Sequence, residues 1–497
     1  MTNWIEKSNG LDISIRNFID GQYVACRGTE TFSKYSPRDG SLLYEVPHGE
    51  AEDANEAISN AKAVFESGVW SRRSAGERKK VLLKLADLME EHAEELSLLE
   101  CLDVGKTIQQ SLAVVPKAAG VIRYNAEAAD KLFGKMHMTS EANLSYELRH
   151  PIGVAAGIIA WNAPVNLAAM KIGPALAVGN SLVLKPAELA SLSTARLAEL
   201  AIEAGLPKGV LNVVHGLGTT VGATIAHHLD VDLLSFTGST QTGKQLLIAS
   251  GQSNMKKLML ECGGKSPSII FEDCPDLDTA ADAVTAFAFN NQGQVCSAGT
   301  RLLVQRNIQE VFLEKVLERV AKLKPDDPLK PETNFGALIS LDHMNKVLGY
   351  IDSAKQDGTQ LLCGGERLAT DNGGYYVPPT IFDNVKPDQK IAQEEIFGPV
   401  LSVMSFDDET DAVSIANDSD FGLAAYVWTS DSGRAHRMID NIKAGGIMVQ
   451  TANNGWSGGP AFGAMSIEPH KLSGLGSELG IDGLKAYTIN RRGMIYL

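Results

Sequence analysis

The chain has 497 residues, of which 44% are hydrophobic and 21% are charged. This length exceeds one hydrophobic core and indicates about three domains, and the composition excludes both a small disulfide scaffold and a largely disordered chain. The formal net charge of −15 argues against nucleic acid or an anionic membrane as the main partner.

The cysteines and the N-terminus bear on the compartment. Six cysteines are widely spaced, without a CxxC pair or clustered Cys/His spacing, so we expect reduced thiols and no metal site. The N-terminus lacks a basic stretch followed by an apolar core, and no apolar run approaches the ~18 residues that span a bilayer. We therefore expect a soluble cytoplasmic protein.

The elements follow one another in two α/β series. Apolar positions spaced three and four residues apart predict amphipathic helices over 51–67 and 75–100. Short apolar runs at 154–160, 181–187, 210–216 and 233–239 then alternate with stretches long enough for helices, which implies a parallel sheet with crossover helices. A second series follows 257–271, with strands in 301–305, 401–406, 424–430 and 445–450 and a helix in 308–323.

Two segments fit neither series. Residues 129–151 and 484–497 alternate polar and apolar side chains, which predicts strands. They form either an arm that pairs with a neighbouring subunit or a local hairpin. The Gly/Pro-rich stretch 453–476 is expected to be a long ordered loop.

Three side chains are candidates for chemistry. Cys296 lies in the polar segment FNNQGQVCSAGTR, where a thiol can sit at a turn, although a lone cysteine is more often a small buried hydrophobe. Glu261 ends an apolar strand and could serve as a general base in the crevice at the carboxyl edge of the sheet, or could cap the next loop. Asn162 also follows a strand, so its amide could donate to an oxyanion or simply form a turn.

Two segments suggest a dinucleotide. Gly238 and Gly243 follow an apolar strand and begin a helix whose N–H groups could face a phosphate, with Ser239 as a hydroxyl donor; an ordinary turn is the alternative. Lys185 and Glu188 follow another strand, where the carboxylate could bind ribose hydroxyls and would repel a 2′-phosphate. This favours NAD over NADP, unless the two residues are only a surface pair.

Taken together and in this order, the segments resemble motifs of the aldehyde dehydrogenase superfamily over nearly the whole chain. The matching segments are AWNAP, GPALAVGNSLVLKPAE, SFTGSTQTG, LECGGKSP, FNNQGQVCSAG, EEIFGPV and SGLGSELG. The resemblance implies an α/β fold with a Rossmann-like NAD-binding domain over 1–128 and 152–263 and an α/β catalytic domain over 264–472. It also implies a small β arm over 129–151 and 473–497 that builds homodimers or homotetramers.

The resemblance implies a role for each matching residue. Cys296 matches the family nucleophile, which attacks the aldehyde to give a thiohemiacetal. The oxyanion is held by Asn162 and the Cys296 N–H, and hydride transfer leaves a thioester. Glu261 matches the base that activates the hydrolytic water, and Lys171 matches a lysine near the same site. The matching cofactor residues are Lys185 and Glu188 at the adenosine ribose, Ser239 with Gly238 and Gly243 near the pyrophosphate, Glu395 and Phe397 at the nicotinamide ribose and ring, and Trp161, whose backbone approaches the cofactor.

Departures from the family pattern concern the substrate pocket. Ala163 stands where relatives commonly have an aromatic residue, and Met170 stands where they often have Trp or Arg. Together with Val295 and Ser297 beside the cysteine, these residues predict a wide, uncharged pocket for a bulky apolar aldehyde, such as a branched, cyclic or aromatic one. Cys262 replaces the usual leucine, and a second thiol near the site makes oxidative inactivation plausible.

The sequence also has alternative functional interpretations. In a CoA-acylating aldehyde dehydrogenase, CoA instead of water would resolve the thioester, and Glu261 argues against that reading. A semialdehyde dehydrogenase is a further alternative. A non-catalytic protein with the same fold conflicts with the joint presence of Cys296, Glu261 and Asn162.

Overall fold

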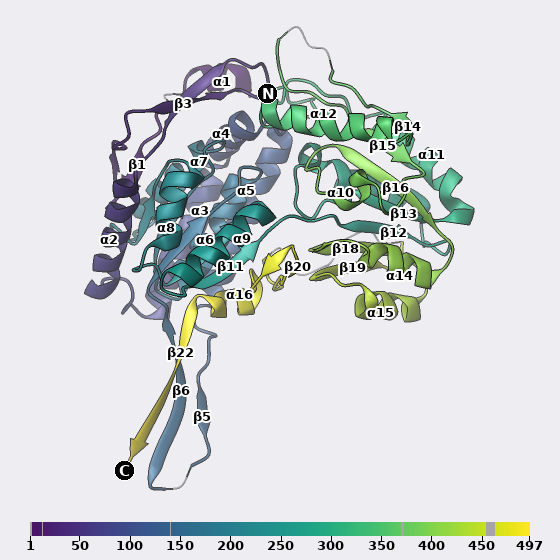
Figure 1. Cartoon of the computed structure of the whole chain (residues 1–497). Helices are drawn as coiled ribbons and strands as arrows, with labels where there is room; N and C mark the ends of the chain where they lie inside the picture. The colour runs from purple at the N-terminus through teal and green to yellow at the C-terminus, as the bar shows by residue number, and fades with distance from the viewer. Residues whose placement is uncertain (1, 12, 140, 369–371, 454–462) are drawn as a thin grey trace.

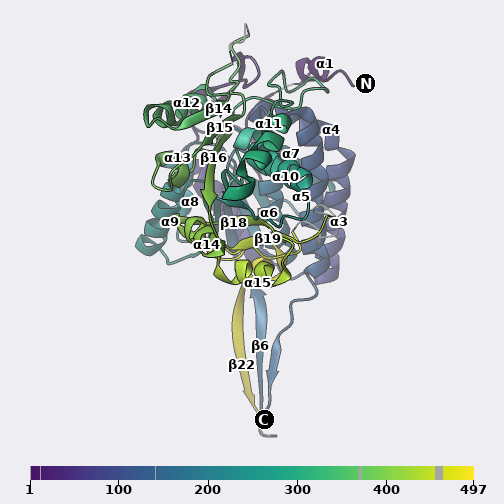
Figure 2. The same cartoon turned by 90° about the vertical axis from the view of Figure 1, so that its right-hand side faces the viewer.

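Two α/β lobes and a projecting arm make up the molecule (Figure 1). The computed structural model describes residues 2–11, 13–139, 141–368, 372–453 and 463–497. Each lobe is built around a mostly parallel sheet, as the alternation of apolar runs and helices predicts. The view in Figure 2 shows the arm extending away from both lobes.

The first lobe contains an eight-stranded sheet in the order β2-β1-β9-β8-β7-β10-β11-β21. Its strands are β1 (Asn17–Ile19), β2 (Gln22–Val24), β7 (Val154–Ile158), β8 (Ser181–Lys185), β9 (Leu211–Val213), β10 (Leu233–Thr237), β11 (Lys257–Glu261) and β21 (Gly474–Leu475). The five strands from β9 to β11 in this order are parallel, and the outer pairings are antiparallel. The central strands are buried on both faces, which explains their continuous apolar runs.

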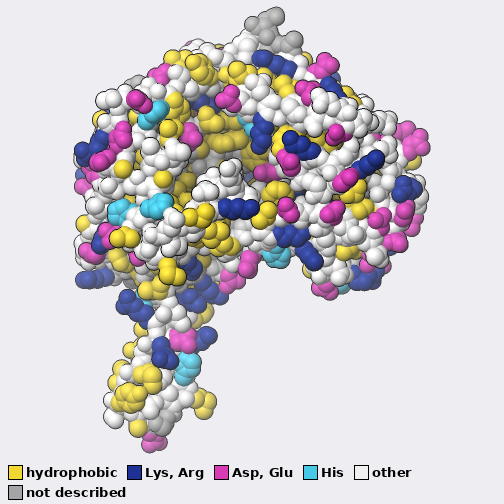
Figure 3. Space-filling view, viewed as in Figure 1, with side chains coloured by type: hydrophobic (Ala, Val, Ile, Leu, Met, Phe, Trp, Pro, Cys, Tyr) yellow, Lys and Arg dark blue, Asp and Glu magenta, His cyan; other side chains and the backbone are white. Residues whose placement is uncertain are grey.

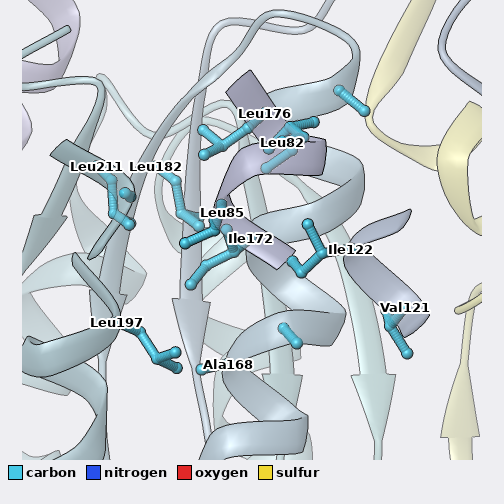
Figure 4. Packing of buried hydrophobic residues seen from close by; sticks show 14 of the residues in the cluster. Leu82, Leu85, Val121, Ile122, Ala168, Ile172, Leu176, Leu182, Leu197 and Leu211 are labelled. Carbon is cyan, nitrogen blue, oxygen red and sulfur yellow. The ribbon is translucent and has the colours of Figure 1, made fainter. Parts of the chain in front are cut away.

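Helices cover both faces of this sheet. One face packs against α3 (Ala75–Glu91), α5 (Ile108–Ala128), α6 (Pro164–Ala177) and α7 (Leu192–Glu203), and the other against α2 (Ala51–Ser67), α8 (Ala223–His227) and α9 (Thr240–Gln252). Leu182 and Leu184 join the first core and Val183 joins the second, because successive strand residues point to opposite faces. Figure 4 shows Leu182 among the buried side chains of the first core.

The helix predicted over 75–100 is two helices. α3 ends at Glu91, and α4 (Ala93–Val104) begins after His92, whose φ of −99° and ψ of 22° break the helical path. The prediction of an amphipathic helix is wrong for α4, because every residue from Leu96 to Val104 is buried. Elements remote in sequence cover it, including α1 (Trp4–Asn9) and the hairpin of β3 (Thr31–Tyr35) and β4 (Leu42–Pro47).

The second lobe contains a seven-stranded sheet in the order β14-β15-β16-β13-β12-β18-β19, parallel except for β14. Its strands are β12 (Pro267–Ile270), β13 (Arg301–Gln305), β14 (Gln360–Cys363), β15 (Thr380–Asp383), β16 (Val400–Phe406), β18 (Ala424–Trp428) and β19 (Gly446–Gln450). One face carries α10 (Leu277–Phe289) and α11 (Gln309–Val320), and the other carries α12 (Leu341–Gln356), α13 (Lys390–Gln393), α14 (Glu409–Asn417) and α15 (Ser432–Asn441). The second predicted series is confirmed, although the apolar runs did not predict β14 and β15.

The arm is a three-stranded antiparallel sheet of β5 (Lys135–His137), β6 (Asn143–Pro151) and β22 (Thr488–Tyr496). β22 pairs with β6 along its whole length, from Thr488 opposite Pro151 to Tyr496 opposite Asn143. The rest of the segment 473–497 lies in the first lobe, where β21 pairs with β11 and α16 (Gly480–Ala486) packs into the core. The arm thus takes only β22 from the C-terminal segment.

The predicted loop over 453–476 is described in part. Residues 454–462 lie outside the described residues. The later part contains β20 (His470–Lys471), which pairs with β17 (Phe421–Gly422) of the second lobe.

Candidate active site

The candidate site lies where the two lobes meet. Asn162 follows β7 and Glu261 ends β11, so both lie at the carboxyl edge of the first sheet, with Thr237 of β10 opposite Glu261 in register. Cys296 comes from the second lobe, between α10 and β13. In Figure 3 the surface is hollowed between the lobes, and hydrophobic side chains line the hollow.

Asn162 is held against the segment that carries Cys296. Its side-chain Nδ2 donates to the Gln294 carbonyl oxygen at 2.9 Å, and Asn291 Nδ2 donates to the Asn162 carbonyl oxygen at 3.0 Å. Asn291 and Gln292 adopt φ values of 49° and 57°, an unusual left-handed turn that directs the chain back toward Asn162. A primary amide has two N–H donors, so one of them remains for another acceptor.

The backbone of Cys296 packs closely against Gly264, and the side chain is of intermediate exposure with a raised thiol pKa. A Cβ atom at Gly264 would lie 2.2 Å from the Cys296 carbonyl oxygen, so only glycine allows this approach. Burial, together with the negative charges of Glu261 and Glu395, raises the pKa of the Cys296 thiol to about 12. All six cysteines are free thiols.

Glu261 lies beside a buried charge network. Burial raises the pKa of Glu261 well above its ordinary value; the Glu478 carboxylate raises it further and Lys171 acts in the opposite direction. Lys171 is fully buried and its Nζ pairs with Glu478 Oε1, which also accepts a hydrogen bond from Ser235 Oγ at 2.8 Å. The sequence did not single out Glu478, although it lies in the recognised motif SGLGSELG.

The residues predicted for the adenosine half of the cofactor lie at β8 and at the start of α9. Lys185 is buried, donates to the Pro186 carbonyl oxygen at 3.0 Å and lies 3.6 Å from the Glu188 carboxylate, which is partly exposed. Burial lowers the pKa of Lys185. Ser239 is the N-cap of α9 and accepts from the Thr242 N–H at 3.1 Å.

Two glycines fix the position of α9. The Gly238 N–H donates to the Glu261 carbonyl oxygen at 3.0 Å, which ties the start of the helix to β11. A Cβ atom at Gly243 would lie 2.8 Å from Cys262 Sγ, so α9 packs closely over Cys262. The N-terminus of α9 therefore lies next to the strand that carries Glu261.

Glu395 and Phe397 bring the second lobe to the same cleft. Glu395 Oε1 accepts from the Gly264 N–H at 2.9 Å, and the Phe397 ring meets Trp161 edge-on at 5.1 Å. Glu188 and Glu395 lie at the two ends of this set, with the N-terminus of α9 between them and aromatic rings beside Glu395. Carboxylates can bind ribose hydroxyls, a helix N-terminus can bind a pyrophosphate, and aromatic rings can contact a nicotinamide. The donor set therefore fits a nicotinamide dinucleotide. No group of three or more metal-ligating side chains lies together in the part of the chain that the structure describes.

The predicted pocket residues fall into two groups. Val295 and Ser297 line a cavity of about 560 Å³ that also takes in Phe287 and Tyr426. The Tyr426 hydroxyl donates to the Ser297 carbonyl oxygen at 2.9 Å, and its ring stacks on Phe287 at 4.3 Å. The sequence did not predict these two aromatic residues.

Ala163 and Met170 lie on the side of the first lobe. They are partly buried, both pack against its core, and neither lines the 560 Å³ cavity. Met170 Sδ accepts a weak hydrogen bond from Asn166 Nδ2 at 3.6 Å.

Comparisons with known proteins identify the class. The model of the aldehyde dehydrogenase family matches residues 23–491. The curated NADP/NAD-dependent aldehyde dehydrogenase PuuC of Escherichia coli (strain K12) is 47% identical over 486 residues, which cover 98% of this chain and 96% of that protein.

Solved structures of aldehyde dehydrogenases also superpose on this chain. Indole-3-acetaldehyde dehydrogenase AldA of P. syringae, in complex with NAD+ and IAA, superposes with a TM-score of 0.96 at 46% identity over 99% of both chains. The aldehyde dehydrogenase KauB of Pseudomonas aeruginosa has the same TM-score, identity and coverage. The chain belongs to the aldehyde dehydrogenase family. It is an enzyme that oxidises an aldehyde with NAD, and the predicted family, fold class and cofactor are confirmed.

Proposed function

We propose that this enzyme oxidises a bulky apolar aldehyde to the carboxylic acid through a thioester on Cys296. The observation that carries the proposal is the meeting of Asn162, Cys296 and Glu261 at the junction of the lobes. The Asn162 amide touches the segment that carries Cys296, and the charge of Glu261 acts on the Cys296 thiol.

In the acylation half of the reaction, the Cys296 thiol releases its proton to water and its sulfur adds to the aldehyde carbonyl carbon. The free N–H of Asn162 and the Cys296 backbone N–H stabilise the oxyanion of the thiohemiacetal. Bound NAD supplies the acceptor for the hydride that leaves this carbon. Lys185 and Glu188 would hold its adenosine ribose, Ser239 with Gly238 and Gly243 its pyrophosphate, and Glu395, Phe397 and Trp161 its nicotinamide side.

In the deacylation half, Glu261 removes a proton from the water that attacks the thioester. A raised pKa makes Glu261 a stronger base than an exposed carboxylate and still able to return the proton. Lys171 and Glu478 act through Glu261, because their opposite charges set its pKa in opposite directions. The products are the acid and the free Cys296 thiol.

The pocket supports a bulky apolar substrate. Ala163 and Met170, which lie on the first lobe outside the 560 Å³ cavity, are small or pliable where family members commonly carry larger or charged residues. Phe287, Tyr426 and Val295 line the 560 Å³ cavity, together with the charged side chains Lys117, Asp282 and Arg319. A relative with 46% identity is named for indole-3-acetaldehyde, which is a bulky aromatic aldehyde.

The arm and the domain division complete the proposal. We assign 1–128 and 152–263 to the NAD-binding domain, 264–472 to the catalytic domain, and 129–151 with β22 of the segment 473–497 to the arm; the rest of that segment joins the NAD-binding domain. Met136 is 75% exposed and Tyr496 is 76% exposed, so the small arm sheet leaves apolar side chains uncovered. Pairing with another copy of the chain, as a homodimer or homotetramer, would cover them.

NADH formation by the purified protein with NAD and no CoA tests the substrate proposal. A panel should run from acetaldehyde and succinic semialdehyde to branched, cyclic and aromatic aldehydes. We expect the highest kcat/KM with the bulky apolar members. Equal or better turnover of succinic semialdehyde would refute the apolar pocket, and turnover only after CoA is added would refute the role of Glu261.

A further inference from the structure

Two buried carboxylates on α4 reach the N-termini of two other helices. Glu100 and Asp103 lie one turn apart, and their residues are 1% and 0% exposed. Glu100 Oε2 accepts from the Val165 N–H at 3.1 Å, and Asp103 Oδ2 accepts from the Leu192 N–H at 2.9 Å. Val165 lies in the first turn of α6, and Leu192 is the first residue of α7.

Neither helix is capped by its own N-cap side chain. The N-cap of α6 is Ala163, which has no acceptor, and Ser191 at the N-cap of α7 makes no capping bond. The first N–H groups of a helix lack partners within the helix, and leaving such a group buried and unpaired is destabilising. A carboxylate in this position also interacts favourably with the helix dipole. Glu100 and Asp103 therefore replace the missing caps.

The two capped helices begin directly after the two halves of the site. Asn162 immediately precedes the N-cap of α6, and the segment from Lys185 to Glu188 leads into α7. Fixing the first turn of α6 fixes the backbone from which the Asn162 amide projects. Fixing the first turn of α7 fixes the loop that carries the residues predicted for the adenosine ribose.

Each carboxylate is held in turn by a second buried group. Lys106 Nζ donates to Glu100 Oε1 at 2.6 Å, and the side chains of this pair are 4% and 1% exposed. The Tyr44 hydroxyl donates to Asp103 Oδ1 at 2.5 Å. Both oxygens of each carboxylate are thus engaged, one with a supporting side chain and one with a helix N-terminus.

We propose that Glu100 and Asp103 are positioning residues with separate tasks: Glu100 holds Asn162 for the chemical step, and Asp103 holds the Lys185–Glu188 loop for NAD affinity. This inference rests on the proposed roles of Asn162, Lys185 and Glu188. Neither carboxylate touches the reacting atoms.

A pair of double variants isolates the cap made by Glu100. Glu100→Gln/Lys106→Met removes the buried ion pair and keeps an oxygen for the Val165 N–H, whereas Glu100→Met/Lys106→Met removes that oxygen and leaves no unpaired charge. The readouts are the rate constant of the first-turnover NADH burst, with the fastest aldehyde of the panel, and the Kd of NAD from protein fluorescence. We expect the Met/Met variant to lose about ten- to a hundredfold in burst rate, the effect of a displaced catalytic group, with NAD Kd unchanged. The Gln/Met variant should stay close to wild type.

The Asn162→Ala background separates positioning from general damage. If Glu100 acts through Asn162, removing its cap lowers the burst rate only where Asn162 is present. The same loss in both backgrounds would overturn the inference. If the Met/Met protein does not fold, Glu100→Gln alone replaces it. In that variant one side-chain amide must accept from both Lys106 and Val165, and its burst rate is again compared with and without Asn162. An Asn162→Ala variant with a wild-type burst would instead refute the proposed role of Asn162 itself.

Asp103 is tested in parallel. Asp103→Leu/Tyr44→Phe removes the acceptor and its hydroxyl partner, and we expect the Kd of NAD to rise about tenfold or more while the burst rate at saturating NAD is retained. Asp103→Asn keeps an acceptor for the Leu192 N–H, so its NAD Kd should stay close to that of the wild-type protein. This variant replaces the double variant in the comparison if the Leu/Phe protein does not fold. Asp103 variants that lower the burst rate and leave the NAD Kd unchanged would contradict the division of tasks.

Discussion

Cys296 lies in surroundings that suppress its thiolate. Burial and the carboxylates of Glu261 and Glu395 together raise the pKa of its thiol to about 12. Because the thiolate is the reactive form, the resting thiol is a weak target for oxidants and alkylating agents at neutral pH. The same carboxylate that suppresses the thiolate, Glu261, is the base proposed for deacylation.

The pH dependence of alkylation follows from this arrangement. Below a pKa of about 12 the thiolate fraction rises with pH, so iodoacetamide should label Cys296 about tenfold faster per pH unit from pH 7 to pH 10, without a plateau. Glu261→Gln removes one of the charges that raise this pKa and should increase labelling at pH 8. Peptide mass spectrometry measures the rate at each cysteine, with Cys296→Ala as the control. A plateau near pH 8 in the wild-type protein would contradict the raised pKa.

Asn162 should contribute only in the transition state. Loss of one oxyanion donor costs about 10²–10³ in kcat, so we expect Asn162→Ala to lower kcat by this factor. Steady-state kinetics over a range of aldehyde concentrations measure the effect. An increase in KM with unchanged kcat would place Asn162 in substrate binding instead.

Sequence reasoning identifies the residues that stand in local motifs and misses those that act across the chain. Cys296, Glu261 and Asn162 each lie in a recognisable segment at the end of a strand or in a turn. Glu478 meets Lys171 across 307 residues, and nothing local marks it as a partner of Glu261. Glu100 and Asp103 carry no signal either, because a carboxylate on a helix is ordinarily expected to face solvent.

At the scale of elements, the short strand β21 closes the edge of the first sheet beside Glu261. Gly474 lies opposite Glu261 in register, with a φ of 136°. A Cβ atom at this position would lie 1.8 Å from the Leu260 carbonyl oxygen. Only glycine lets β21 pair with β11, and this pairing also leads the chain toward Glu478.

We expect Gly474→Ala to force β21 away from β11. The strain and the lost pairing should lower the free energy of unfolding by about 1–3 kcal/mol and should slow deacylation more than acylation. Denaturant unfolding and burst kinetics measure the two effects.

Gly251→Ala in α9 is the matched control for this change. A Cβ atom there would have no atom within 4 Å apart from its chain neighbours and its own helix backbone, so this substitution should stabilise by about 0.4–1 kcal/mol. Equal changes in the free energy of unfolding and in the deacylation rate for the two variants would show that the pairing of β21 with β11 has no special role at the site.

A longer helix or strand is easier to predict, because it contains a longer hydrophobic pattern. The central strands β7, β8, β10 and β13 have five residues each, of which at least four are buried, and they are recognised from the sequence. Strands of two residues, such as β20 and β21, have no pattern of their own. They form only because the rest of the fold brings their partners close, as with β21 and β11.

In the whole molecule, the arm is the part against which no helix or second sheet of the described chain packs. Three strands without a helix or second sheet against them have little core of their own, and Tyr496 and Met494 remain 76% and 48% exposed. The free edge of β22 adds unpaired backbone groups. A second copy of the chain would cover both.

Replacing Met494 and Tyr496 by serine should weaken this pairing. We expect sedimentation analysis to show a smaller species than the wild-type protein at the same concentration. Leu341→Ser, at a 44% exposed position on α12 of the second lobe, is the control and should leave the mass unchanged. An unchanged mass of the arm variant would refute the assembly role of the arm.

In the proposed mechanism, water activated by Glu261 completes the reaction after acylation of Cys296. The most direct measurement is rapid-mixing NADH formation by the Glu261→Gln variant with NAD and aldehyde, without CoA. We predict a burst of about one NADH per site followed by a stall, with the acyl group found on Cys296 by mass spectrometry. Steady turnover at the wild-type rate would remove Glu261 from the mechanism.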